Sequence, residues 1–292
     1  MNVHELRNFL ALAECLNFRQ AGKVCGLSPS AMTRSIQRLE EEAGGVLFMR
    51  DNRSVALTEA GAIFKTYASE AVREWEGVCE TIRRMHGENG VRGRVTLYAS
   101  VTAVYSLLPE LLEKYRALYP EVKLDLKTGA AEESVELVLA GDVDVAVAAL
   151  PDGEHPGLEF MPLAKTDLVF VSAREIKALP MVRGRLDLSE APLVLPKSGL
   201  SRQRLDRWLR EKRVKPNVQA EVSGNEGILS MVRLGSGVGV VPELVLEKSP
   251  FRDEVKKITK APKLEPYTVG LCAAKKSLAR PAVAALWSLT EE

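Results

Sequence analysis

The segment 17–40 constrains the fold of this chain most tightly, because it combines two helix starts with a turn between them. Asn17 can cap the first helix with its side-chain oxygen. Gly26 permits the turn, after which Ser28 can accept from the free N–H groups of a second helix and Pro29 suits its first position. The pattern predicts a helix–turn–helix unit.

The second helix of this unit is predicted to bury one face and to present a polar one. The buried face consists of apolar residues at helical spacing, namely Met32, Ile36, Leu39 and Ala43. The polar residues opposite it or on its flanks are Ser30, Thr33, Arg34, Gln37 and Arg38, with Ser28 at the helix start. Hydroxyl, guanidinium and carboxamide groups can bind base edges and phosphates in a DNA major groove. An ordinary solvated helix face is the alternative.

The flanking sequence favours DNA binding over that alternative. Two short strand patterns at 46–50 and 54–58 enclose the polar turn 51–53 and predict a two-stranded wing. Apolar residues at 6, 9, 10 and 13 predict an amphipathic first helix, so the order is three helices and a wing. The candidate DNA contacts of this winged helix–turn–helix are Ser28, Ser30, Thr33, Arg34, Gln37, Arg38, Arg50 and Arg53.

One motif set makes this assignment more specific. The run Ser-Pro-Ser-x-x-x-Arg-x-Ile-x-x-Leu-Glu at 28–40 is followed by Leu-Phe-x-Arg at 47–50 and Leu-Thr-x-Ala-Gly at 57–61. Together these motifs resemble the DNA-binding module of the LysR-type transcriptional regulators. The resemblance implies a partner that is a double-stranded DNA operator or promoter, and RNA polymerase as a further partner.

Charge does not by itself indicate a nucleic-acid partner. The 292 residues carry 40 Lys and Arg against 39 Asp and Glu, a net charge of +1. Residues 1–65 contain 8 basic and 7 acidic side chains, which is again +1. DNA binding must therefore depend on where the charges point, because an overall basic field is absent.

Several functional classes are disfavoured by what the sequence lacks. The first residues do not form a secretory signal, and no run of 18 apolar residues exists, so we expect a cytoplasmic protein with no membrane partner. Cys15, Cys25, Cys79 and Cys272 show no CxxC spacing and are expected to be reduced thiols, with a redox-sensing pair as the less favoured alternative. The three histidines are too isolated to predict a metal site.

Enzyme signatures are also missing. The glycine-rich segment 235–239 lacks the glycine spacing of a dinucleotide fingerprint and precedes a strand pattern instead of a helix. Neither a G-x-S-x-G elbow nor a phosphate-binding Walker loop is present. We therefore expect no enzyme activity, no metal and no cofactor.

A long helix is predicted after the wing. Thr58 can cap it, and its apolar residues recur at alternating steps of four and three, namely Phe64, Ala68, Ala71, Trp75, Val78, Ile82 and Met85. Charged residues occupy the outer positions, so the apolar seam is narrow. This favours a dimerisation helix over a core-facing helix of a single domain. A homodimer or homotetramer would hold two recognition helices about one DNA turn apart.

From Arg94 onward, strand and helix patterns alternate, which predicts an α/β domain with parallel sheets and ligands at the carboxyl ends of the strands. Two such lobes with a crossover resemble the LysR effector domain, which is similar to a type 2 periplasmic-binding protein. The expected domains are the winged helix–turn–helix DNA-binding domain at 1–58, the dimerisation helix at 59–87, a hinge at 88–93 and the effector domain at 94–292. Its first lobe covers about 94–163 and 266–292, and its second about 164–265.

Four loops at predicted strand ends could line an effector cleft. Their candidate ligand-binding residues are Ser100, Thr102, Thr128, Ser198 and Asn225. Hydroxyl and N–H groups at helix starts can bind a carboxylate. The alternative is that these side chains only cap helices.

A narrower resemblance points to an inducer. The segments 50–53, 100–106, 230–235, 242–250 and 273–276 are similar to LysR-type activators of the acetohydroxy acid isomeroreductase gene in isoleucine–valine synthesis. That resemblance implies an activator and autorepressor of branched-chain amino acid biosynthesis, induced by 2-acetolactate or 2-aceto-2-hydroxybutyrate. The alternatives are a LysR-type regulator with another inducer, such as an aromatic acid or an amino acid, and a solute-binding component.

Overall fold

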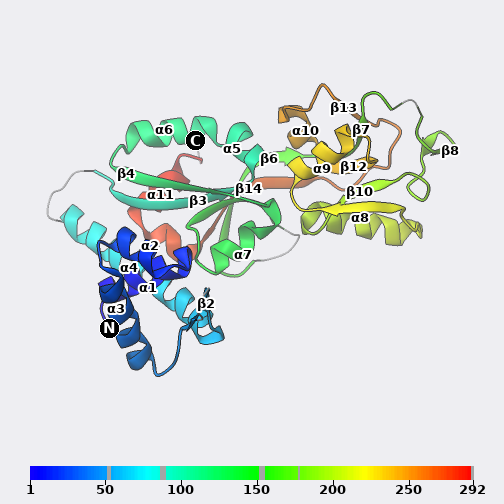
Figure 1. Ribbon diagram of the computed structural model, residues 1–292. Helices are drawn as coiled ribbons and strands as arrows, with labels where there is room; N and C mark the ends of the chain where they lie inside the picture. The colour runs from blue at the N-terminus through cyan, green and yellow to red at the C-terminus, as the bar shows by residue number, and fades with distance from the viewer. Residues whose placement is uncertain (51–53, 86–89, 151–154, 177, 291–292) are drawn as a thin grey trace. The chain divides into compact units, whose positions relative to one another are not determined.

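A computed structural model describes residues 1–50, 54–85, 90–150, 155–176 and 178–290 of the chain, except for the side chains of residues 84 and 85 (Figure 1). The chain divides into two compact units. The N-terminal unit comprises Met1–Gly93 and Ala140–Asp142, and the C-terminal unit comprises Arg94–Leu139 and Val143–Glu292. Each unit is described by itself.

The N-terminal unit is a winged helix–turn–helix followed by a long helix. Its elements are α1 (Val3–Cys15), α2 (Phe18–Cys25), α3 (Pro29–Ala43), β1 (Phe48–Arg50), β2 (Val55–Leu57) and α4 (Glu59–Met85). The predicted caps are present, because Asn17 Oδ1 accepts from the Gln20 N–H and Ser28 Oγ accepts from the Ala31 N–H. The predicted wing is confirmed, since β1 and β2 pair antiparallel.

Aromatic side chains hold the core of this unit together. Phe9 is fully buried, and its ring lies 5.2 Å from that of Phe48 and 4.9 Å from that of Phe64. α3 buries Met32, Ile36 and Leu39 against this core, as its spacing predicts. Ala43 was expected on the same face but is exposed, because the last turn of α3 extends beyond the core.

The first lobe of the C-terminal unit is a five-stranded sheet within the described residues, in the order β4-β3-β5-β14-β6. Its strands are β3 (Gly93–Ala99), β4 (Val122–Thr128), β5 (Val145–Ala149), β6 (Leu158–Thr166) and β14 (Tyr267–Ala274). In Figure 1, α6 (Pro109–Leu118) lies over one face of this sheet and α7 (Ser134–Leu139) lies below the other. The remaining helices of this lobe are α5 (Val101–Ser106), η1 (Ala131–Glu133), η2 (Lys275–Ala279) and α11 (Pro281–Ser288).

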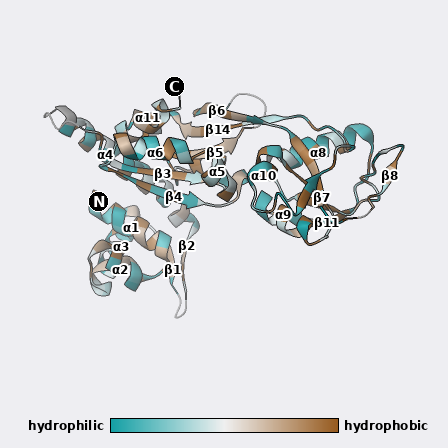
Figure 2. Cartoon of the chain, turned by 90° about the horizontal axis from the view of Figure 1, so that it is seen from above, coloured by the Kyte–Doolittle hydropathy of each residue, from teal (hydrophilic) through white to brown (hydrophobic). Residues whose placement is uncertain are grey.

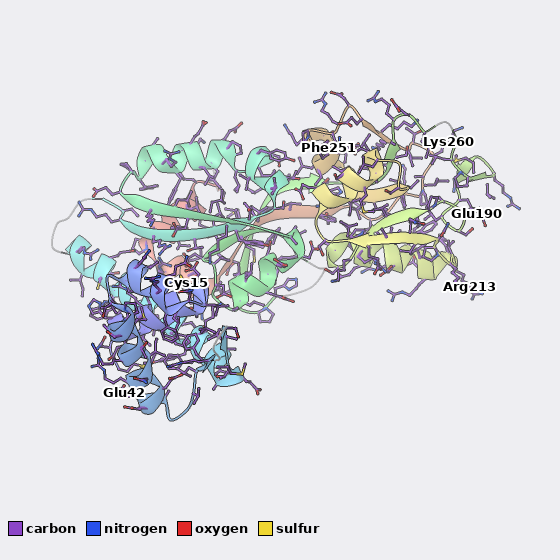
Figure 3. All side chains as sticks on the ribbon, viewed as in Figure 1. Cys15, Glu42, Glu190, Arg213, Phe251 and Lys260 are labelled. Atoms are coloured by element: carbon purple, nitrogen blue, oxygen red, sulfur yellow. The ribbon has the colours of Figure 1, made fainter. Side chains whose placement is uncertain are left out.

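The second lobe contains another five-stranded sheet within the described residues, in the order β11-β10-β12-β7-β13. Its strands are β7 (Leu168–Ala173), β10 (Leu193–Pro196), β11 (Val218–Val222), β12 (Val238–Pro242) and β13 (Val255–Lys257). Its helices are α8 (Gly199–Lys212), α9 (Asn225–Arg233) and α10 (Glu243–Lys248), and β8 (Met181–Val182) pairs with β9 (Arg185–Leu186) as a small hairpin. In Figure 3, Glu190, Arg213 and Lys260 lie together at one end of this lobe.

Both sheets are mixed, so the prediction of parallel sheets was wrong in part. β3 and β5 pair parallel, whereas β14 runs antiparallel to both β5 and β6. In the second lobe β10 pairs parallel with β11 and β12, and β7 runs antiparallel to β12 and β13. The antiparallel strands are the ones next to the two crossings between lobes. A chain that enters the second lobe and later returns must reverse its direction in each sheet.

Alternating side chains explain why the five-stranded sheet of the second lobe carries helices on both faces. In β7, Leu168 and Phe170 pack in the same cluster as Leu205 of α8. Val169 and Val171 point to the other face and pack with Ile228 of α9. The whole strand is buried, which gives a continuous apolar run instead of a polar and apolar alternation. Figure 2 shows the apolar character of β7 and β3.

A buried ion pair joins distant segments of the first lobe. Arg280 Nη1 lies 2.6 Å from Asp144 Oδ1, and the two side chains are only 7% and 4% exposed. The other Asp144 oxygen accepts from the Thr96 N–H at 2.8 Å. Arg280 Nη2 also donates to the carbonyl oxygen of Arg94. These bonds connect the start of α11 to the start of the first strand of the unit.

The described residues contain neither a membrane-crossing helix nor a metal-binding cluster. No helix there is both long and apolar enough to cross a membrane. No group of three or more His, Cys, Asp and Glu side chains in that part of the chain is arranged to hold a metal ion. The four cysteines are free thiols.

Candidate DNA-reading face and effector cleft

The outer face of α3 presents long polar side chains to solvent. Arg34, Gln37 and Arg38 are all exposed, on the side opposite the buried Met32 and Ile36. The Arg38 guanidinium reaches only to 3.9 Å from the Glu5 carboxylate and is 67% exposed. These long side chains can therefore reach an outside partner and donate hydrogen bonds to it.

The hydroxyl groups at the start of α3 are engaged locally. Ser28 caps the helix, and its Oγ lies 3.1 Å from the Oγ of Ser30. Thr33 Oγ1 donates to the Pro29 carbonyl oxygen at 2.9 Å. Oxygen lone pairs remain on each hydroxyl, but the local bonds fix where they point. The hydroxyls of Ser28, Ser30 and Thr33 therefore have less freedom than the long side chains beyond them.

The wing is attached to α3 through Glu40, a role that the sequence did not reveal. Glu40 Oε1 accepts from the N–H groups of Leu47 and Phe48 at 2.9 and 3.1 Å. Its other oxygen lies 2.6 Å from Arg50 Nη2, and the Arg50 guanidinium lies 5.0 Å from the centre of the Phe18 ring. Arg50 is thus held at the base of the wing. Arg53, the other predicted wing contact, lies outside the described residues.

The predicted dimerisation stripe on α4 divides into two parts. Ala68 is buried, and Phe64 and Ala71 are half-buried against the core of their own unit. Further along, Trp75, Val78 and Ile82 are 51%, 50% and 49% exposed. The side chain of Met85 lies outside the described residues. Only the second part of the stripe is therefore exposed enough to pair with a partner.

Two more apolar residues of α4 extend the exposed part toward the N-terminus. Ile63 and Tyr67 are 70% and 48% exposed, and neither belongs to the predicted heptad stripe. With a rotation of about 100° per residue, they fall within the same sector of roughly 120° as Trp75, Val78 and Ile82. The exposed seam of α4 consists of Ile63, Tyr67, Trp75, Val78 and Ile82.

Three of the five predicted effector residues meet in the C-terminal unit. Ser100, Thr102 and Asn225 line a hollow of about 60 Å³, together with Pro242 of β12 and Tyr267 of β14. Ser100 caps α5 by accepting from the Ala103 N–H at 3.3 Å. The hollow therefore lies between the two lobes.

Glu226 accepts the hydrogen bonds that Thr102 donates, a role that the sequence did not reveal. The backbone N–H of Thr102 donates to Glu226 Oε1 at 2.8 Å, and the Thr102 hydroxyl donates to the same oxygen. Glu226 lies in the first turn of α9, which starts after Gly224 at a left-handed φ of +78°. The residue next to the predicted Asn225 thus makes a contact across the lobes.

Thr128 and Ser198, the other predicted effector residues, do not converge with these. Both are exposed, and neither is among the described residues that line the hollow. Ser198 makes no side-chain cap for α8. The start of α8 nevertheless reaches the first lobe, because a Cβ on Gly199 would lie 3.1 Å from the Cβ of Glu132.

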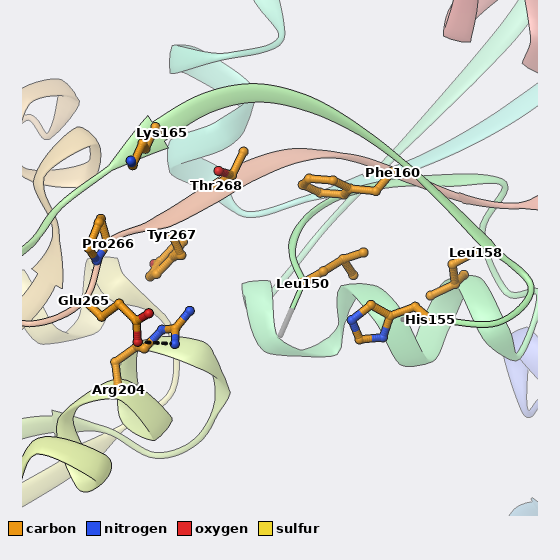
Figure 4. Close-up of a pocket in the computed structure, with 10 residues that line it drawn as sticks. All are labelled: Leu150, His155, Leu158, Phe160, Lys165, Arg204, Glu265, Pro266, Tyr267 and Thr268. Carbon is orange, nitrogen blue, oxygen red and sulfur yellow. Dashed lines mark hydrogen bonds and ion pairs between the residues drawn. The ribbon is translucent and has the colours of Figure 1, made fainter. Parts of the chain in front are cut away.

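A larger cavity of about 670 Å³ lies beside β6 and β14 (Figure 4). At one end Arg204, which is buried, pairs with Glu265, and Lys165 lines the same cavity. Leu150 and Phe160 are apolar residues that line it near His155. The cavity therefore combines a charged end with an apolar end.

Tyr267 lines both the small hollow and the larger cavity. Desolvation raises the pKa of Tyr267 to about 12, and the Ser201 hydroxyl, 3.1 Å from the phenol oxygen, opposes part of that shift. The phenol therefore stays protonated at neutral pH and can donate a hydrogen bond. The sequence identified neither Tyr267 nor Arg204 as a site residue. In the sequence, Arg204 resembles any other charged residue on a solvated helix.

A winged helix–turn–helix with an exposed polar recognition helix, followed by a two-lobed α/β unit, is the architecture of a DNA-binding regulator of transcription. Family comparisons agree. Residues 3–62 match the bacterial regulatory helix-turn-helix proteins of the lysR family, and residues 88–292 match the LysR substrate binding domain. The chain belongs to the LysR family of transcriptional regulators, which are not enzymes and which bind DNA as oligomers.

Individual relatives cover the whole chain. The HTH-type transcriptional activator IlvY of Haemophilus influenzae is 35% identical over 294 residues, which is 100% of both chains. A full-length OxyR variant from Pseudomonas aeruginosa has a similar structure, with a TM-score of 0.71 at 20% identity over 100% of this chain and 94% of that one. CbnR in complex with its target DNA gives a TM-score of 0.64 at 22% identity, over 100% and 99%. These two structures support the fold.

Proposed function

We propose that this regulator is an activator, and an autorepressor, that controls branched-chain amino acid biosynthesis in response to a small carboxylate. The observation that carries the proposal is the full-length identity of 35% to the activator IlvY. The resemblance of the sequence to activators of isoleucine–valine synthesis implies 2-acetolactate or 2-aceto-2-hydroxybutyrate as the inducer. In this proposal the inducer is the sole small molecule required, with no cofactor or metal.

For the DNA-binding step, α3 enters the major groove of a palindromic operator. Arg34 and Gln37 are the base-reading side chains in this proposal, because they are exposed opposite the buried face. Ser28, Ser30, Thr33 and Arg38 contribute phosphate or base contacts at the edges of the helix, and Arg50 and Arg53 do so from the wing. A homodimer or homotetramer paired through α4 presents two such helices, and contact with RNA polymerase follows at the promoter.

For the ligand-binding step, the inducer carboxylate binds at Ser100, Thr102 and Asn225. Thr102 lines the hollow and is 1% exposed, and its N–H and hydroxyl both donate to a carboxylate oxygen of Glu226. Charge-assisted hydrogen bonds of this kind are the strong ones. Thr128 and Ser198 would have to approach from the rim as the lobes move.

Titration calorimetry of the full chain with 2-acetolactate tests this proposal. We expect saturable binding to the wild-type chain, weaker binding to Thr102→Val, and near-wild-type binding to Thr102→Ser, which retains both donors. At about one hundred times its dissociation constant, the inducer should add about 2.7 kcal/mol to the free energy of unfolding. No heat with acetolactate, together with binding of an unrelated acid, would contradict the isoleucine–valine assignment.

A different inducer is the second candidate, and the larger cavity favours it. Its volume of about 670 Å³ exceeds what a five-carbon acid needs, and its ionic and apolar ends suit an aromatic acid or an amino acid. A thermal-shift screen of small carboxylates on the wild-type chain separates the two candidates. The third alternative, that the protein is a solute-binding component, is less favoured because it does not explain the N-terminal winged helix–turn–helix.

A further inference from the structure

The contact between Glu226 and Thr102 joins the two lobes through one carboxylate oxygen. Thr102 belongs to α5 in the first lobe, and Glu226 belongs to α9 in the second, 124 residues away in sequence. The same oxygen accepts both the N–H and the hydroxyl of Thr102. The protein thus supplies its own carboxylate to the donors that the proposed function reserves for an inducer.

An inducer carboxylate and Glu226 cannot bind the donors of Thr102 together. Glu226 Oε1 already accepts from both the N–H and the hydroxyl of Thr102. In addition, a second carboxylate within about 4–6 Å of Glu226 would be repelled by it. An acid can therefore reach the donors of Thr102 only after the Glu226 side chain has left them.

We propose that Glu226 is an internal competitor of the inducer. In the unliganded chain its carboxylate occupies the position of the inducer carboxylate and holds α9 against α5. An inducer binds by displacing Glu226 from Thr102, which releases the second lobe to adopt another arrangement. This inference rests on the proposed ligand site, and it adds how that site is regulated.

Displacement has a measurable consequence for affinity. A tethered group competes at an effective concentration that is typically millimolar, and a ligand whose competent state is only partly populated binds more weakly by that fraction. Removing the competitor should therefore tighten inducer binding. We expect the dissociation constant of 2-acetolactate to fall about tenfold or more in Glu226→Ala. Glu226→Gln, which keeps an acceptor but loses the charge, should give an intermediate value.

The exchange rate of the Thr102 amide tests the contact without any inducer. Thr102 lies in the first turn of α5, where a backbone N–H has no partner within the helix. Glu226 is the acceptor of this N–H in the structure. Hydrogen exchange at residue 102 should accelerate at least tenfold in full-length Glu226→Ala. It should stay at the wild-type rate in the control Glu247→Ala, which alters an exposed acid elsewhere in the second lobe.

Acetate supplies the second arm, since it is a free carboxylate of minimal size. In Glu226→Ala, millimolar acetate should slow the Thr102 exchange again, whereas in the wild-type chain acetate should have no effect. Unchanged exchange in Glu226→Ala overturns the proposal, as does weaker acetolactate binding in that variant. If acetolactate binds none of the variants while exchange and acetate rescue behave as expected, the competitor is supported and the choice of inducer fails.

Discussion

The two units use polar side chains in opposite ways. On α3 of the N-terminal unit, Arg34 and Gln37 extend into solvent from a helix whose other face is buried. In the C-terminal unit, Thr102 and Asp144 are almost completely buried, and each is bonded to a side chain from a distant segment. The first arrangement serves a partner that arrives from outside. The second arrangement consists of buried hydrogen bonds and ion pairs within the protein, which a ligand or a mutation has to break.

This difference has an energetic meaning. An exposed polar side chain changes stability little when it is removed, and its value appears only when DNA is bound. A buried polar group is expensive to leave without its partner. We therefore expect substitutions in the N-terminal unit to separate function from stability, and substitutions in the C-terminal unit to couple them.

The largest expected effect is in the buried pair of the C-terminal unit. Arg280→Met removes the guanidinium from its buried pair with the Asp144 carboxylate, and breaking a buried pair of this kind should cost about 3–5 kcal/mol of unfolding free energy. The comparison variant is Arg50→Met, which breaks the pair with Glu40, where the Arg50 side chain is 30% exposed. That loss should be about 1 kcal/mol. Equal losses in chemical denaturation would break the contrast between the units.

The next effect concerns the exposed seam of α4. Val78→Glu places a charge at the centre of this seam, and burying it in a dimer should cost about 3 kcal/mol. Sedimentation should then show a smaller assembly, and DNA binding should weaken because two recognition helices are no longer held together. Arg83→Glu, on another side of α4, is the control. A wild-type assembly in Val78→Glu with normal DNA binding would rule out pairing through the seam.

A smaller effect is expected at the DNA-reading face. Arg34→Ala should leave the unfolding free energy within about 0.5 kcal/mol of wild type, since the side chain is exposed. It should nevertheless cost about 1–3 kcal/mol of discrimination between operator and other DNA. Footprinting at fixed salt measures this, with Arg210→Ala on the exposed side of α8 as the control. An unchanged footprint and affinity would remove Arg34 from the reading face.

The success of sequence reasoning follows the same division between units. Helix caps and the buried stripe of α3 depend on residues three and four positions apart, so Asn17, Ser28, Met32 and Ile36 could be placed from local spacing. The lobes could also be anticipated, because buried strands give continuous apolar runs. What local spacing could not give was the mixed direction of the strands, which depends on where the chain crosses between lobes.

The candidate effector site was predicted in part, for a related reason. Ser100 and Thr102 carry a local signal, since a hydroxyl at a helix start is visible in the sequence. The partner of Thr102 has no such signal, because Glu226 is 124 residues away and resembles any acid in the first turn of a helix. Similarly, the first half of the α4 stripe has the spacing of a dimer seam, but Phe64 and Ala68 pack against the core of their own unit.

The smallest expected effect compares thiols in the two units. Cys272 is fully buried in the first-lobe sheet, and desolvation raises its pKa from 9.0 to about 11. At pH 8 the fraction of reactive thiolate should therefore be about a hundredfold lower than for a thiol of ordinary pKa. In the folded chain, iodoacetamide should modify the half-buried Cys15 and Cys79 well before Cys272.

The same shift predicts a dependence of stability on pH. The folded-state pKa of Cys272 is raised, so its contribution is fully present below the unfolded-state pKa near 9 and is lost as the pH rises toward 11. In Cys272→Ala this loss should be absent, and the difference in unfolding free energy between the two chains should shrink across that range. A constant difference from pH 8 to 11, together with rapid labelling of Cys272 at pH 8, would show that the first-lobe sheet opens to solvent as readily as the N-terminal unit.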